Sequence, residues 1–107
     1  MSITINIYYT GKNGSAKKFV REMIDTCIVD EIKNENGNLK YDYFYPHGDD
    51  ETVLLIDSWV NQEALDIHHN LPVMKKIALL REKYDLHMRV EKYILTDYND
   101  DDKFIRK

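Results

Sequence analysis

The sequence is short of cysteine, proline and glycine. Its 107 residues include one cysteine, two prolines and four glycines. Because Cys27 is alone, an internal disulfide and a multi-cysteine zinc or iron–sulfur site are both excluded, and a reducing compartment is favoured. We expect this thiol to be buried and inert on the apolar side of a helix. No linker interrupts the chain, so we predict one domain over residues 1–95 and an acidic tail over residues 96–107.

Positive charge and long apolar runs are also lacking. The chain carries 15 basic and 19 acidic side chains, a net charge of −4, whereas nucleic-acid-binding proteins usually show the opposite balance. No apolar run approaches the ~18 residues that span a bilayer. The first residues lack the basic and then apolar regions of a signal peptide. We therefore expect a cytoplasmic protein that binds neither nucleic acid nor membranes.

Hydrophobic spacing predicts four strands and two helical regions. Alternating apolar residues indicate strands at residues 3–8, 38–45 and 87–95, and a continuous apolar run indicates a further strand at 52–59. Helical spacing indicates one helix over residues 16–34 and a second helical region over residues 61–83, which Pro72 interrupts. This order, β-α-β-β-α-β, predicts an α+β, ferredoxin-like fold with an antiparallel sheet.

One face of such a sheet would remain without helices. The strand at residues 52–59 is apolar on both faces, and the strand at 38–45 places Leu39, Tyr41, Tyr43 and Tyr45 on one side. A monomer would then expose a large apolar patch, which soluble proteins seldom do. We infer a homodimer in which two sheets pack face to face.

The most informative stretch for function is residues 57–68. Trp59 ends a predicted strand, and His68 lies three positions after Leu65 on the inward face of the next helix. With the tyrosine-rich strand, these residues could line a pocket between the sheet and the helices that suits a small aromatic or quinone-like molecule. His68 and the adjacent His69 do not face each other, and no partner four residues away completes a metal site, so we expect none.

The chain resembles a known family at these positions. The segment Asn36–Tyr41, followed by Trp59 and by residues 63–68, is similar to the antibiotic biosynthesis monooxygenase family, and most to its small quinol-monooxygenase-like members. The resemblance covers residues 3–95. It implies a dimeric α+β barrel that oxidises a phenol or hydroquinone with O₂ and needs no flavin, haem or metal, so no cofactor is expected.

The resemblance also implies roles for individual residues. Trp59 would stack on or wall the substrate ring, and His68 would hydrogen-bond the phenolic oxygen or take its proton. Asn38 or Asn6 would orient a carbonyl or the oxygen molecule. Arg89 would stabilise an oxyanion.

Two positions of the predicted pocket depart from the family pattern. Leu55 and Leu65 stand where polyketide-oxidising relatives carry an asparagine and a tyrosine. Haem-degrading relatives carry a histidine about ten residues beyond the position of His68, where this chain reads Lys-Ile-Ala-Leu at 76–79. A haem role is therefore disfavoured.

Two alternatives remain open at the level of the sequence. One is an isomerase of a small phosphorylated hydroxycarbonyl, as in autoinducer-2 processing, which would need a cationic pocket drawn from Arg89, Lys40 and Lys92. The other is a non-catalytic dimer that binds a small molecule. In that case Trp59 and His68 would be ordinary core residues.

Overall fold

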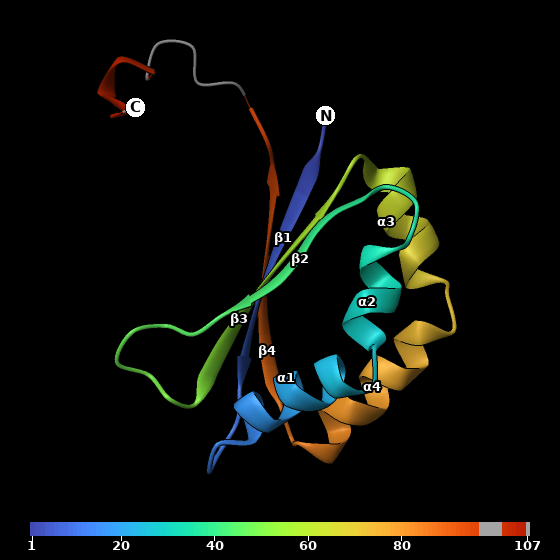
Figure 1. The fold of residues 1–107 in the computed structure, drawn as a ribbon, viewed down its shortest axis with the longest axis vertical. Coiled ribbons are helices and arrows are strands. Elements are labelled where there is room, and N and C mark those ends of the chain that lie inside the picture. The colour runs from blue at the N-terminus through green and yellow to red at the C-terminus, as the bar shows by residue number, and fades with distance from the viewer. Residues whose placement is uncertain (97–101, 107) are drawn as a thin grey trace.

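The chain folds into one antiparallel sheet with four α-helices on one of its faces (Figure 1). The structure, a computed structural model, describes residues 1–96 and 102–106. The sheet has the strand order β2-β3-β1-β4, and its strands are β1 (Ile3–Thr10), β2 (Asn38–Phe44), β3 (Thr52–Trp59) and β4 (His87–Ile94). The helices are α1 (Ser15–Asp25), α2 (Ile28–Lys33), α3 (Gln62–His69) and α4 (Val73–Lys83). This is the predicted ferredoxin-like α+β fold.

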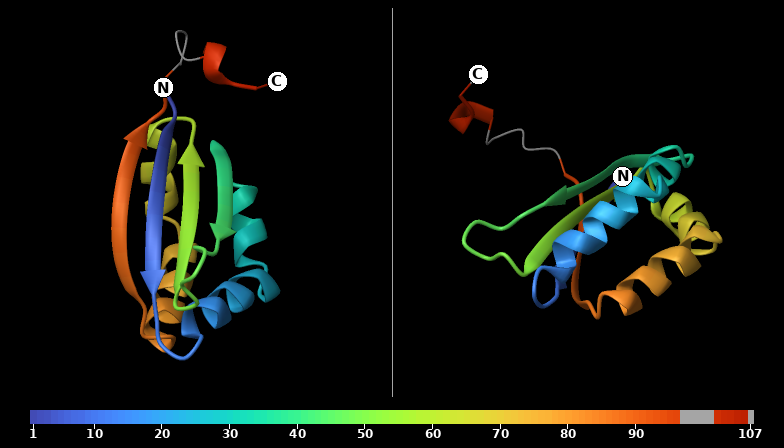
Figure 2. Two further views of the ribbon diagram at one scale, coloured as in Figure 1. Left: turned by 90° about the vertical axis from the view of Figure 1, so that its left-hand side faces the viewer. Right: turned by 60° about the horizontal axis from the view of Figure 1, so that its bottom comes forward.

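Alternation along the central strands gives the sheet two different faces. On β1 the buried residues are Ile3, Ile5, Ile7 and Tyr9, and they point toward the helices. The register pairs Ile5 with Asp57 and Ile7 with Leu55, so these β3 side chains share the helix-covered face. The intervening residues point to the other face, which no helix covers (Figure 2, left). We call these the covered face and the bare face.

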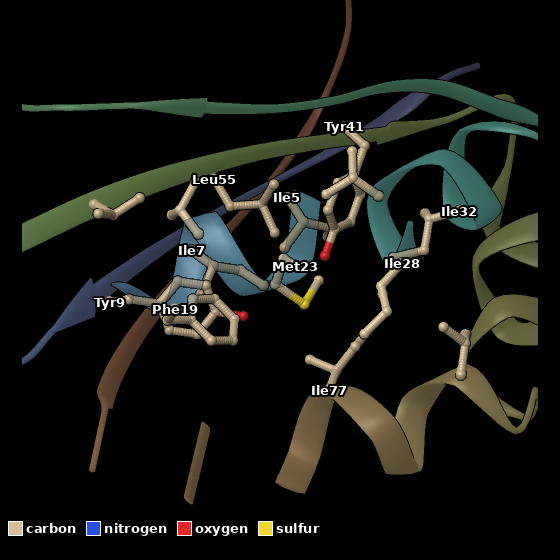
Figure 3. Close-up of a cluster of buried hydrophobic side chains, with 14 of the residues drawn as sticks. Ile5, Ile7, Tyr9, Phe19, Met23, Ile28, Ile32, Tyr41, Leu55 and Ile77 are labelled. Atoms are coloured by element: carbon tan, nitrogen blue, oxygen red, sulfur yellow. The ribbon is translucent and has the colours of Figure 1, made fainter. Parts of the chain in front are cut away.

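The core lies between the covered face and the helices (Figure 3). Phe19 and Met23 on α1 are fully buried there, and the ring of Phe19 lies 5.0 Å from that of Tyr9 on β1. Ile77 from α4 closes the cluster from the helical side. Burial of each such side chain contributes about 1.5–3 kcal/mol to folding, so this cluster accounts for most of the hydrophobic stabilisation.

The predicted helix over residues 16–34 is broken. Its two parts, α1 and α2, are separated by Cys27, whose backbone is left-handed with φ of 63°. That conformation turns the chain between the helices and moves the side chain off the apolar stripe. Cys27 is exposed, so the prediction of a buried thiol is wrong.

The predicted faces of the second strand are also wrong in part. A register shift between Asn38 and Lys40 leaves Leu39 57% exposed. Tyr41 then points to the covered face, where it is 2% exposed and packs edge-on against Tyr43. These tyrosines therefore belong to the monomer core, and they do not make the bare face apolar.

The second helical region matches its prediction closely. The side-chain oxygen of Asn61 accepts a hydrogen bond of 2.9 Å from the backbone N–H of Ala64 and so caps α3. Pro72 separates α3 from α4. Of the predicted tail at 96–107, residues 97–101 and 107 lie outside the described residues, and Asp102–Phe104 forms a 3₁₀ turn. Across the part of the chain that the structure describes, every helix is too short or too polar to cross a membrane.

Candidate functional site

Two aromatic rings meet where the end of β3 faces α3. Trp59 is the last residue of β3, and alternation turns it to the covered face. Its indole stacks on the imidazole of His68, with ring centroids 4.7 Å apart and an interplanar angle of 30°. Trp59 is 0% exposed and His68 is 3% exposed. The structure thus brings the two predicted residues together, but their rings fill the space between strand and helix instead of bordering an open pocket.

A glutamate completes this group. Glu35, just after α2, contacts Nδ1 of His68 with both carboxyl oxygens, at 2.9 and 3.0 Å. Burial raises the pKa of Glu35 to about 7, and the neighbouring charge of Glu31 adds to this. Burial also lowers the pKa of His68 to about 4, and the positive charge of Arg81 contributes.

The Glu35–His68 pair therefore works as one unit. Between the two pKa values the pair holds one proton between Nδ1 and the carboxyl group and carries no net charge. Above the pKa of Glu35 the carboxylate is ionised and accepts the Nδ1–H of a neutral imidazole. Such a pair can take up and return a single proton near neutral pH, which is the requirement for general acid–base chemistry.

A second buried carboxyl group lies beside the stacked rings. Asp57 is 5% exposed, and its Oδ1 accepts a 2.7 Å hydrogen bond from Nε1–H of Trp59. Burial raises the pKa of Asp57 to about 7, and the charge of Glu35 acts in the same direction. The bond from Trp59 opposes this rise and fixes the orientation of the indole.

Phenolic hydroxyls continue the polar groups across the covered face. The Tyr9 hydroxyl accepts hydrogen bonds from Nε and Nη2 of Arg81, at 3.1 and 2.8 Å. Among the described residues the buried Tyr43 hydroxyl has no hydrogen-bond partner. Burial raises the pKa of both tyrosines, so their hydroxyls are neutral. The core therefore contains a run of polar groups, and the Tyr43 hydroxyl has spare hydrogen-bonding capacity.

A groove opens to the surface next to the Glu35–His68 pair. Its volume is about 540 Å³, and its lining residues are Glu35, Asn36, Gly37, Val60, Asn61, Glu63, Ala64, Ile67 and Leu71. Gly37 has φ of 90°, and a Cβ there would lie 2.7 Å from the Cβ of Ala64. Only glycine allows this close approach of the α2–β2 turn to α3. Glu35 thus lies both at the groove and against the buried imidazole.

Three further residues that were predicted for the site have structural roles. Leu55 and Leu65 are 1% and 2% exposed and belong to the core. Asn38 donates from Nδ2 to the backbone oxygens of Lys40 and Ser58, at 3.2 and 3.4 Å. These bonds hold the irregular start of β2, and they occupy the amide that was predicted to orient a substrate or oxygen.

Asn6 and Arg89 lie on the bare face. The guanidinium of Arg89 lies 4.0 Å from the ring centre of Tyr8, and its Nη1 donates to Glu91 at 2.9 Å. Oδ1 of Asn6 is buried and has no partner among the described residues. The sheet therefore separates both residues from His68.

Glu35, Asp57 and Arg81 were missed by the sequence reasoning. Asp57 had a usable signal, because Val53, Leu55, Asp57 and Trp59 alternate and an acid at an inward position predicts a buried carboxyl group. Glu35 had none, since its contact with His68 joins positions 33 residues apart. Within residues 1–96 and 102–106, no cluster of three His, Cys, Asp or Glu side chains could hold a metal ion.

Comparison with known proteins adds independent information. The family model described as antibiotic biosynthesis monooxygenase matches residues 2–78. SnoaB, a cofactor-independent oxygenase from Streptomyces nogalater, has a similar structure with a TM-score of 0.75 and 12% identity, covering 91% of this chain and 95% of its own. A Pseudomonas aeruginosa protein has a TM-score of 0.76 and 22% identity, covering 90% and 95%. A Bacteroides thetaiotaomicron protein has a TM-score of 0.75 and 17% identity, and the match covers 86% of this chain and 95% of that protein. No curated protein matches the sequence significantly.

Proposed function

The chain belongs to the antibiotic biosynthesis monooxygenase family, and on this premise we propose that it is a cofactor-independent monooxygenase of a small aromatic, quinol-type substrate. The observation that carries this proposal is the Glu35–His68 pair, which holds a single proton at the edge of the core. Perturbed acid–base groups of this kind concentrate at catalytic sites. The likeness to SnoaB supports the reaction class, since that protein is an oxygenase that uses no cofactor.

The proposed reaction balances without a further reductant. One atom of O₂ enters the ring of a quinol and the other leaves as water, so the substrate is oxidised by four electrons to a hydroxylated quinone. The protein removes a phenolic proton first, because the phenolate gives up an electron to O₂ more readily than the phenol does. The same proton is returned when water forms, so an acid–base pair that holds one proton suffices.

The side chains around the pair support this chemistry. Trp59 stacks on the imidazole of His68 and keeps water from it, which strengthens the electrostatic interactions of the pair. Asp57 fixes the indole through its hydrogen bond. Glu35 aligns Nδ1 of His68 with two oxygens.

Oxygen uptake tests the proposal. With a panel of substituted hydroquinones we expect O₂ consumption and a hydroxylated quinone as the product, identified by mass spectrometry. His68→Gln keeps a polar side chain but loses the imidazole, and we expect it to lower kcat by about 100-fold or more. His87→Gln is the matched control, since this histidine is exposed and lies on β4. If no hydroquinone raises uptake above that of buffer, the monooxygenase assignment fails.

We also propose that two copies pack through their bare faces. The apolar side chains there are Tyr8, Phe44, Leu54, Ile56 and Tyr93. Phe44 and Tyr93 are 44% and 49% exposed in the single chain, and a second copy would cover them. Ile56→Asp would then convert a sedimenting dimer into a folded monomer. A wild-type protein that sediments as a monomer at micromolar concentration would refute this.

The geometry does not favour the phosphate isomerase. Lys40 on β2 and Arg89 on β4 lie on opposite edge strands of the sheet. Lys92 lies on the other face of β4 from Arg89 and contacts Gln62 on α3. No shared cationic pocket is formed by these three residues. A non-catalytic binding protein is distinguished from the monooxygenase by the oxygen-uptake measurement above.

A further inference from the structure

The groove beside Glu35 is the place where the surface reaches the buried acid–base pair. We propose that this groove binds an uncharged phenol or quinol ring, that Glu35 is the group that meets the phenolic hydroxyl, and that His68 acts through Glu35. This inference rests on the proposed function and assigns the contact with substrate to a residue that no sequence pattern indicated.

The shape and walls of the groove suit one small ring system. Its volume of about 540 Å³ lies within the range of small-molecule sites. Val60, Ala64, Ile67 and Leu71 provide an apolar wall, and Asn36 and Asn61 add amide groups at the rim. Val60 and Ile67 are 42% and 57% exposed, so a bound ring would remove apolar surface from water.

The charges of the groove select against anions. Its ionisable lining residues are Glu35 and Glu63, and no Lys, Arg or His lines it. An anionic group would be repelled, whereas a hydroxyl can donate to a carboxylate without repulsion. The complementary ligand is therefore neutral and carries an O–H donor, as a phenol does and an aryl phosphate does not.

The position of Glu35 makes the proton transfer short. When Glu35 is ionised, a phenol in the groove can give its proton directly to the carboxylate, which becomes a carboxylic acid as the phenol becomes a phenolate. The negative charge then moves from the pair to the substrate, and the contact with Nδ1 of His68 stabilises either form. His68 is thus a positioning residue, and its own ring needs no access to the substrate.

Several ionisable groups surround Glu35. Glu31 lies on α2, Glu63 and His68 lie on α3, and Asp57 lies on β3. Burial and the charge of Glu31 favour the protonated form of Glu35. Binding of a neutral phenol should therefore depend on pH through Glu35, and this dependence should disappear in Glu35→Gln.

Nuclear magnetic resonance with 4-methylphenol as the probe tests the site without turnover. We expect the amide signals of Gly37, Asn61 and Ala64 to shift, and 4-methylphenyl phosphate to shift none of them. Ile67→Asn should weaken binding about fivefold by removing part of the apolar wall. Leu79→Asn is the matched control, because Leu79 is 66% exposed on α4 and does not line this groove.

The outcomes separate the site from the reaction. Glu35→Gln should weaken binding about threefold to tenfold above neutral pH, where a charge-assisted bond is lost. A second groove lies between β2 and the helices α1 and α2 and includes Tyr43 and Phe44. Shifts that centre on this second groove would overturn the inference, and so would equal weakening by Ile67→Asn and Leu79→Asn. Binding at Gly37 without O₂ uptake from hydroquinones would uphold the site and reject the reaction. Uptake of O₂ without a shift of the Gly37 amide signal would uphold the reaction and reject the site.

Discussion

The two faces of the sheet carry similar residue types in different surroundings. On the covered face, Asp57 is 5% exposed and burial raises its pKa to about 7. On the bare face, Glu91 pairs with Arg89, and this contact lowers the pKa of Glu91. The sequence predicted site residues on both faces, Trp59 on the covered face and Asn6 and Arg89 on the bare face. Burial governs the pKa of the carboxyl group on the covered face, whereas an ion pair governs that of the carboxyl group on the bare face, so the covered face is where catalysis is to be sought.

The largest expected effect comes from removing the indole on the covered face. Trp59→Ala deletes a fully buried ring that stacks on His68, and we expect a loss of about 3–5 kcal/mol in the free energy of unfolding. Urea denaturation measures it. A loss below about 1 kcal/mol would mean that the cavity collapses without cost and that Trp59 does not organise this region.

The pH dependence of stability sharpens the comparison. Asp57 and Glu35 have raised pKa values in the fold, so the native chain holds more protons than the unfolded chain, and stability should fall as pH rises through about 7. The pKa of His68 is lowered in the fold, so its contribution to stability rises with pH between about 4 and 6.5. This rise cancels the fall in stability that one of the two acids causes over the same range. We expect a net loss of about 3 kcal/mol between pH 5 and pH 8.

Asp57→Asn isolates the contribution of this carboxyl group. The asparagine oxygen can still accept the bond from Trp59, but the group no longer titrates. Urea denaturation of the variant should then show almost no pH dependence between pH 5 and pH 6.5, because Glu35 and His68 cancel there. A variant that retains the full slope of the wild type would show that Asp57 is not the titrating group.

The smallest expected effect is on the bare face. Arg89→Ala removes an exposed ion pair with Glu91, and its effect on the free energy of unfolding should be below about 1 kcal/mol. Oxygen uptake should be unchanged, because the sheet separates Arg89 from His68. A kcat that falls with Arg89→Ala as far as with His68→Gln would remove the distinction between the two faces.

Local patterns predicted much of this structure. A continuous apolar run located β3 at residues 52–59, and Asn61 marked the start of α3 by its capping ability. The meeting of Trp59 and His68 followed from strand alternation and helical spacing. These features depend on contacts close in sequence or on the known geometry of regular elements.

Other features depend on tertiary geometry that no local pattern encodes. The left-handed backbone at Cys27 divides the first helix, although the apolar stripe continues past it. The register shift between Asn38 and Lys40 separates Leu39 from the face that Tyr41 and Tyr43 share. Glu35 reaches His68 only because Gly37 lets the α2–β2 turn approach α3. For this reason the acid–base partner of His68 could be found only in the structure.

The titration of His68, followed by nitrogen-15 magnetic resonance of its imidazole, is the measurement to make first. If Glu35 and His68 act as one unit, the imidazole should stay neutral on acidification until the pH nears about 4, and its signals should respond near pH 7 when Glu35 gains its proton. The response near pH 7 should vanish in Glu35→Gln. A histidine that titrates in one step near its ordinary pKa of about 6.5, alike in both proteins, would show that the pair does not share a proton.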